Sequence, residues 1–205
     1  MTARRASNRD RILQAAAEML YRSGYNGVSV DDIVAASGVS KSNFYYHFPS
    51  KEDLGLAVLS ARRDVLEQLM DATLRDKERS PATRLAAFFA AILDHQESEL
   101  DRHGCPFGNL VAEMTEHSER IRCFLSGLFA DLTREIAEVI RLGQVTGDFR
   151  DDVAAEDLAS LALQTLQGMQ LIIKCDRDPR PARTSGSVLV ELMRPSRRDE
   201  KPAYS

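Results

Sequence analysis

No apolar run in this 205-residue chain approaches the roughly 20 residues that a membrane-spanning helix needs. The first ten residues are polar and Arg-rich and lack the apolar core of a signal peptide. Three cysteines without a Cys-x-x-Cys pair provide neither a disulfide framework nor a structural zinc site. We therefore expect a cytoplasmic protein that contacts no membrane and has no metal site and no cofactor.

The motifs of common enzyme classes are also absent. The sequence contains no Gly-x-Ser-x-Gly, no Gly-x-x-x-x-Gly-Lys-Ser/Thr and no His-Glu-x-x-His. His95, Glu99 and His103 follow i, i+4 spacing, which arises far more often on a solvated helix face than at a metal site. We predict that the protein is not an enzyme.

Alternating β-branched runs are lacking, and apolar residues recur at helical spacing along nearly the whole chain. The sequence therefore predicts an all-α fold. Glycines and prolines predict a loop at 103–108 and a break at 176–183. The helices expected around them cover 109–116, 118–142, 153–175 and 187–193.

Charge is distributed unevenly along the chain, whose net charge is −4. Seven basic and four acidic residues give the first 51 residues a net charge of +3, whereas the remainder carries −7. A basic N-terminal quarter on an acidic body indicates that one end of the protein meets phosphate groups.

Three short helices are expected in the first fifty residues, joined by turns that contain glycine, as in a helix-turn-helix unit. The first ends at Gly24, the second begins at the N-cap Ser29 and ends at Gly38, and the third begins at the N-cap Ser40. The third helix would present five side chains suited to the edges of bases and to phosphates: Lys41, Ser42, Asn43, Tyr46 and His47. Without further evidence, three core helices with an ordinary polar face would explain the pattern equally well.

The residue string itself closely resembles the TetR family of repressors. The matching stretches are RILQAA at 11–16, GYNGVSV at 24–30, IVAASGVS at 33–40 and FYYHFPSKEDL at 44–54. The resemblance implies a repressor that binds double-stranded operator DNA as a homodimer, with 41–46 as its recognition helix. It also implies that phosphates are held mainly by Ser29, Tyr45, His47 and Lys51, and that Phe44 and Phe48 pack the core of the small domain.

The predicted organisation has four parts: a disordered basic arm at 1–7, a helix-turn-helix domain at 8–54, a helical effector-binding and dimerisation domain at 55–194 and a disordered tail at 195–205. Arg4 and Arg5 form either an arm beside the minor groove or a solvated terminus. A helical ligand carrier without DNA binding would share the body, but it would have no use for the string at 40–51.

The segments 153–175 and 187–193 either close the core of the single chain or form a four-helix bundle with a second chain. The first segment is apolar on several faces, which favours the dimer, and the family resemblance points to the same segments. The predicted interface residues are Leu158, Leu166, Met169, Ile173 and Leu189.

A small, mostly apolar or aromatic effector is expected to bind inside the body and to release the repressor from DNA. Residues that would line its pocket are Phe88, Ile92, Phe107, Leu110, Met114, Phe124, Leu128 and Gln167.

Cys105 offers an alternative trigger. With Gly104 before it and Lys174 far along the chain, it resembles the NemR branch of the TetR family, whose members sense electrophiles and oxidants through a cysteine so placed. The other interpretation of Cys105 is a buried, inert thiol.

Overall fold

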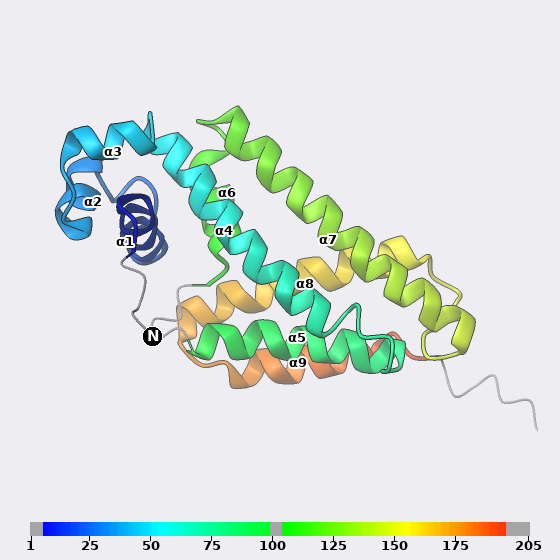
Figure 1. Ribbon diagram of the computed structural model, residues 1–205. Helices are drawn as coiled ribbons and strands as arrows, with labels where there is room; N and C mark the ends of the chain where they lie inside the picture. The colour runs from blue at the N-terminus through cyan, green and yellow to red at the C-terminus, as the bar shows by residue number, and fades with distance from the viewer. Residues whose placement is uncertain (1–5, 99–103, 196–205) are drawn as a thin grey trace, which may run out of the picture. The chain divides into compact units, whose positions relative to one another are not determined.

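The computed structural model of the protein describes residues 6–98 and 104–195. Within these two ranges the chain forms nine α-helices and no strand (Figure 1), which confirms the predicted all-α fold. None of the described helices is both long enough and apolar enough to cross a membrane.

The helices belong to two compact units that do not follow the order of the chain. The first unit comprises residues 1–66 and 103–128, and the second comprises 67–102 and 129–205. Two long helices, α4 (Lys51–Ala72) and α7 (Glu119–Thr146), contribute residues to both units.

The first unit begins with α1 (Asn8–Ser23), α2 (Val30–Ser37) and α3 (Lys41–His47), which all contact one another. The predicted caps are present, because the hydroxyls of Ser29 and Ser40 accept hydrogen bonds from backbone N–H groups in the first turns of α2 and α3. Three side chains without solvent exposure form the centre of this bundle: Ile12, Ile33 and Phe44.

The first unit also contains α6 (Pro106–Met114), which begins inside the segment predicted to be a loop. Pro106 occupies the first turn of α6, where a missing backbone N–H breaks no helical hydrogen bond. The prediction of a loop over 103–108 was therefore wrong for its second half, because this proline starts a helix.

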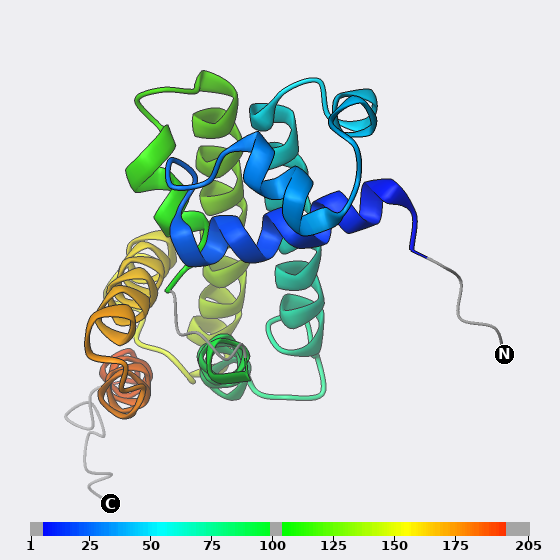
Figure 2. The same cartoon turned by 90° about the vertical axis from the view of Figure 1, so that its left-hand side faces the viewer.

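In the second unit, α9 (Arg180–Leu192) packs against both α5 (Pro81–Ser98) and α8 (Ala155–Asp176), as Figure 2 shows from the end of α5. The turn after α4 is tied to α7 within this unit, because Arg75 donates to Glu135 over 2.6 Å. Arg75 also pairs with Glu67 and Asp71 of α4.

Two helices are longer than predicted. The first of them, α7, continues past residue 142 to Thr146, and the carbonyl of Gly143 accepts hydrogen bonds from the backbone N–H groups of Asp148 and Phe149. The other, α9, begins at Arg180, because Pro181 lies in its first turn and the carboxylate of Asp178 accepts from the Arg180 N–H at 3.0 Å.

Candidate DNA-binding site

The outward face of α3 carries the side chains that are available to DNA. Tyr46 is 82% exposed and Tyr45 is 46% exposed, and Lys41 and Ser42 are also exposed. Phe44, on the opposite face, is fully buried and packs edge-on against the Tyr45 ring at a centroid distance of 5.2 Å. Buried Phe44 thus fixes the helix, and its neighbours point toward solvent.

Asn43 and His47 are partly buried on the same helix. The Oδ1 atom of Asn43 is turned into the unit, where it is buried and has no hydrogen-bond partner among the described residues. A contact between this oxygen and a base would require the Asn43 amide to turn outward. Tyr46 is therefore the better-placed candidate for base recognition.

Ser29 is exposed at the start of α2, and its hydroxyl serves the helix cap. The Oγ atom donates to the Asp32 carboxylate over 2.6 Å and accepts from the Asp32 backbone N–H over 3.1 Å. The Ser29 hydroxyl and the Ser29 backbone N–H, which donates to the same carboxylate over 2.8 Å, lower the pKa of Asp32. A phosphate contact by Ser29 stays a prediction, and it would compete with the cap.

Lys51, expected to hold a phosphate, is engaged inside the first unit. Its Nζ donates to the backbone oxygen of Tyr25 over 2.6 Å and lies 4.1 Å from the centroid of the Tyr25 ring. Partial burial lowers the pKa of Lys51. These contacts give Lys51 a packing role, so its phosphate contact also stays a prediction.

The turn between α2 and α3 is fixed by Gly38, which was expected to end α2, and by Arg11, for which no role was predicted. Gly38 has φ +63°, a left-handed conformation that side chains with a Cβ rarely adopt. The Nη2 atom of Arg11, on α1, donates to the Gly38 carbonyl over 3.1 Å. No sequence pattern signals this contact, because it joins residues 27 positions apart.

The helix α6 and the residue before its cap contact α1 and the loop that follows it. The Tyr21 hydroxyl donates to the Gly104 carbonyl over 2.9 Å, and the Asn26 backbone N–H donates to the Glu113 carboxylate over 3.0 Å. The start of α4 is held in the same unit by Arg120, which pairs with Glu52 and Asp53.

Comparison with known proteins agrees with this geometry. Residues 12–58 match the family described as bacterial regulatory proteins, tetR family, and residues 81–188 match the tetracyclin repressor-like C-terminal domain. The second match alone spans more than half of the chain. The chain belongs to the tetR family of bacterial regulatory proteins.

Relatives support the assignment along almost the whole length of the regulator. The HTH-type transcriptional repressor DhaR of Mycobacterium sp. (strain GP1) is 34% identical over 188 residues, covering 92% of this chain and 93% of DhaR. The crystal structure of the regulatory protein TetR from Rhodobacter sphaeroides superposes with a TM-score of 0.82 at 29% identity, covering 88% of this chain and 96% of that one. The repressor NemR of Escherichia coli is 25% identical to this chain over a stretch that covers 56% of this chain and 57% of NemR.

These findings establish a DNA-binding transcriptional regulator and not an enzyme. Members of the family bind operator DNA, usually act as dimers and are typically released by an effector. The resemblance inferred from the helix-turn-helix string is confirmed.

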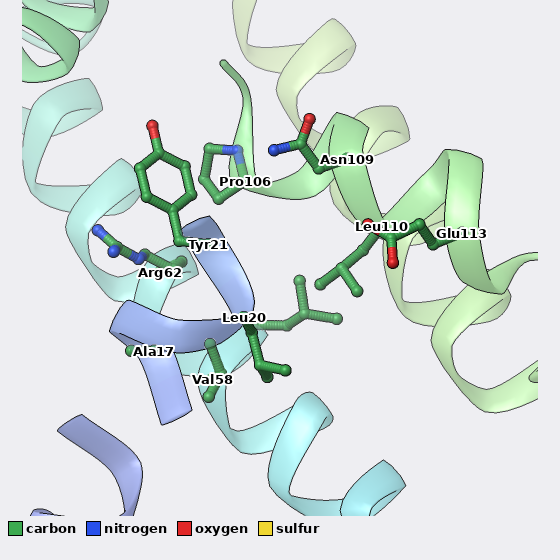
Figure 3. Close-up of a pocket in the computed structure, with 10 residues that line it drawn as sticks. Ala17, Leu20, Tyr21, Val58, Arg62, Pro106, Asn109, Leu110 and Glu113 are labelled. Atoms are coloured by element: carbon green, nitrogen blue, oxygen red, sulfur yellow. The ribbon is translucent and has the colours of Figure 1, made fainter. Parts of the chain in front are cut away.

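A small pocket of the regulator lies where α1, α4 and α6 meet (Figure 3). Leu20, Val58 and Leu110 contribute apolar lining, and Tyr21 and Arg62 contribute polar groups. Its volume of about 20 Å³ has room for a single water molecule, far below the roughly 300 Å³ of a typical ligand site. Leu110 is the member of the predicted effector pocket that lines it.

The other predicted pocket residues are divided between the units. Phe107, Met114 and Leu128 are buried, and Phe124 is partly buried, in the first unit. In the second unit, Phe88 is buried, and Ile92 and Gln167 are partly buried. Burial alone does not distinguish lining from core, so their contact with an effector stays a prediction.

The predicted dimer residues lie in the core of the single chain. All five are buried: Leu158, Leu166, Met169, Ile173 and Leu189. Burial places these side chains in the core of one chain, so their contact with a second chain stays a prediction. On the same two helices, other apolar side chains are exposed: Leu161, Leu171, Ile172, Val188 and Leu192. We call these five residues the α8–α9 apolar surface.

Cys105 is 8% exposed and is the N-cap residue of α6, without a side-chain capping bond. All three cysteines are thiols, and burial shields Cys105 from oxidants. This environment favours the inert interpretation over thiol sensing. Lys174 belongs to the second unit and is exposed.

No group of three potential metal ligands occurs among the described residues. Glu99 and His103, which follow His95 at helical spacing, lie outside those residues. Arg4 and Arg5, expected to form the arm, also lie outside them.

Proposed function

We propose that the regulator represses transcription by binding operator DNA as a homodimer, and that a small, mostly apolar effector releases it. The observation that carries the proposal is the outward face of α3, where Tyr45 and Tyr46 are exposed on a helix anchored by buried Phe44. Residues 8–54 would contact the operator, and residues 55–194 would bind the effector and the second chain. Exposed aromatic side chains are typical of a binding surface.

Repression is supported by DhaR, which is named a transcriptional repressor. The dimer is supported by the α8–α9 apolar surface. Among the described residues, nine large apolar side chains are exposed, and five of them lie on α8 and α9. Because α8 and α9 pack against each other, exposed apolar residues on both helices are typical of a surface that a second chain covers.

An apolar effector is supported by a hollow in the second unit. A hollow of about 260 Å³ follows α5 and α9, close to the lower limit of a ligand site. Its lining is mostly apolar, with the buried side chains of Phe89 and Leu93 and the small residues Ala86, Ala90 and Gly186, and its polar members are Arg183 and Ser187.

Exchanging Tyr46 for alanine should change which bases the regulator prefers, because Tyr46 is 82% exposed on the outward face of α3. Tyr45→Ala should instead weaken binding to all sequences alike, since a phosphate contact positions the protein without reading bases. Selection of binding sites from random duplex DNA measures the base preference, and titration of several unrelated duplexes measures the uniform loss of affinity. Val145→Ala, at a position on α7 that is also 82% exposed, is the matched control and should change neither. An unchanged consensus for Tyr46→Ala would contradict the assignment.

An effector should weaken operator binding with a coupling of ~1–3 kcal/mol, and operator DNA should weaken effector binding by the same factor. Titrations in both directions, with an aromatic ligand selected by thermal shift, measure this reciprocity. Oxidants and maleimides should have no such effect. If these reagents release the regulator from its operator and Cys105→Ser abolishes that release, the trigger is the thiol of Cys105 and not a reversible effector.

A further inference from the structure

An ion pair joins the two helices of the helix-turn-helix. The Nζ of Lys41, the first residue of α3, lies 2.6 Å from Oδ1 of Asp31 in the first turn of α2. The hydrogen bond to Asp31 raises the pKa of Lys41. Both side chains are mostly in solvent, at 56% and 71% exposure, and exposed pairs contribute only about 0–1 kcal/mol to stability. The contribution of this pair to the stability of the fold is therefore small.

Asp31 lies in the first turn of α2, where the helix dipole favours a carboxylate as well as a phosphate. The N-terminus of a helix attracts anions, so the first turn of α2 would favour a phosphate. Two carboxylates occupy that turn, and the capping box accounts for one of them, because Asp32 accepts from the N–H and the hydroxyl of Ser29. The cap does not require Asp31, whose charge opposes a phosphate and neutralises the nearest lysine of the recognition helix.

We propose that Asp31 is a specificity-determining residue of the regulator. By pairing with Lys41, Asp31 weakens the electrostatic attraction of the helix-turn-helix to DNA of any sequence. The pair also holds the Lys41 side chain in one orientation, in which it can contact the operator. The inference rests on the proposed contact of α3 with DNA.

The physical basis is the difference between the two binding modes. Binding to non-operator DNA arises almost entirely from phosphate contacts and the counterions that they release. A lysine already neutralised by a carboxylate displaces fewer counterions from DNA, so binding to non-operator DNA loses the most affinity. Operator binding also gains from contacts to bases, for which a fixed direction of Lys41 is favourable. The pair therefore increases the ratio between operator and non-operator affinity.

The test measures full-length Asp31→Asn on a random-sequence duplex and on an operator obtained by selection, between 50 and 200 mM salt. Affinity for random DNA should rise about tenfold, and the salt slope should steepen by about one to two for a dimer, at ~0.9 per phosphate. Operator affinity should change less than about threefold, so the specificity ratio falls.

Two further variants separate the pair from net charge. Glu18→Gln removes the same charge from an exposed pair with Arg22 on α1 and should leave both affinities unchanged. Adding Lys41→Gln to Asp31→Asn should return random-DNA affinity to that of the wild type. Wild-type affinity of Asp31→Asn for random DNA, or an equal gain from Glu18→Gln, would overturn the inference. A wild-type protein that selects no operator would instead overturn the proposed DNA contact itself.

Discussion

Replacing Leu171 with glutamate is expected to leave a folded monomer whose operator affinity is at least about 100-fold lower. Leu171 is 65% exposed on α8, so the fold does not depend on it, whereas a charge at the centre of a dimer interface is strongly unfavourable. Two linked heads gain roughly 10²–10⁴ in affinity over one, and a monomer forfeits this gain. Light scattering at micromolar concentration and operator titration measure the two effects.

Val145→Glu is the matched control for Leu171→Glu, because Val145 is also apolar and exposed but lies on α7. It should remain dimeric and bind operator as the wild type does. Leu166 is unsuitable for this test, because it is buried within the single chain and a charge there would unfold the protein. A Leu171→Glu protein that stays dimeric with full operator affinity would show that the α8–α9 apolar surface is not the interface.

Phe44→Ala is expected to abolish operator binding without separating the dimer. Phe44 is fully buried and lies near the rings of Tyr45 and Phe48, with centroids 5.2 and 6.2 Å away. Removing such a ring costs about 3–5 kcal/mol, a large share of the stability of a domain. Because α1, α2 and α3 are short, their shared core has little to replace it.

Circular dichroism, light scattering and operator titration together test Phe44→Ala. The dimer should persist, since α8 and α9 belong to the second unit. Phe44→Leu keeps most of the volume, should cost less than about 1.5 kcal/mol and should retain binding. An alanine variant that binds operator normally would mean that this core does not position α3.

Local signals in the sequence were sufficient for the helix-turn-helix. Ser29, Ser40 and Gly38 act through their own backbone neighbourhoods, so their positions predicted where α2 and α3 begin and where α2 ends. For the same local reason, the sequence pattern wrongly predicted non-helical segments at Pro106 and Pro181. A proline is compatible with both a loop and the first turn of a helix, and the sequence pattern alone does not choose between them.

The faces of α8 could not be assigned from periodicity. An apolar side chain packs equally well against its own chain or a second one, so the pattern around Leu166 and Met169 was compatible with both. Burial in the structure separates this inner face from exposed Leu161, Leu171 and Ile172. The ion pair of Lys41 was also missed, although an acidic residue early in α2 and a lysine at the start of α3 are visible in the sequence.

The hydrogen bond between Asn26 and Glu113 joins residues 87 positions apart in the chain and affects the design of chimeric regulators. Grafting residues 1–54 onto the body of another family member would exchange α1, α2 and α3 but leave α6 and the start of α7 foreign. Asn26, Tyr21 and Glu52 would then meet unrelated partners in place of Glu113, Gly104 and Arg120. The smallest portable reading head of this regulator is therefore discontinuous, with residues 104–120 transferred along with the N-terminal helices.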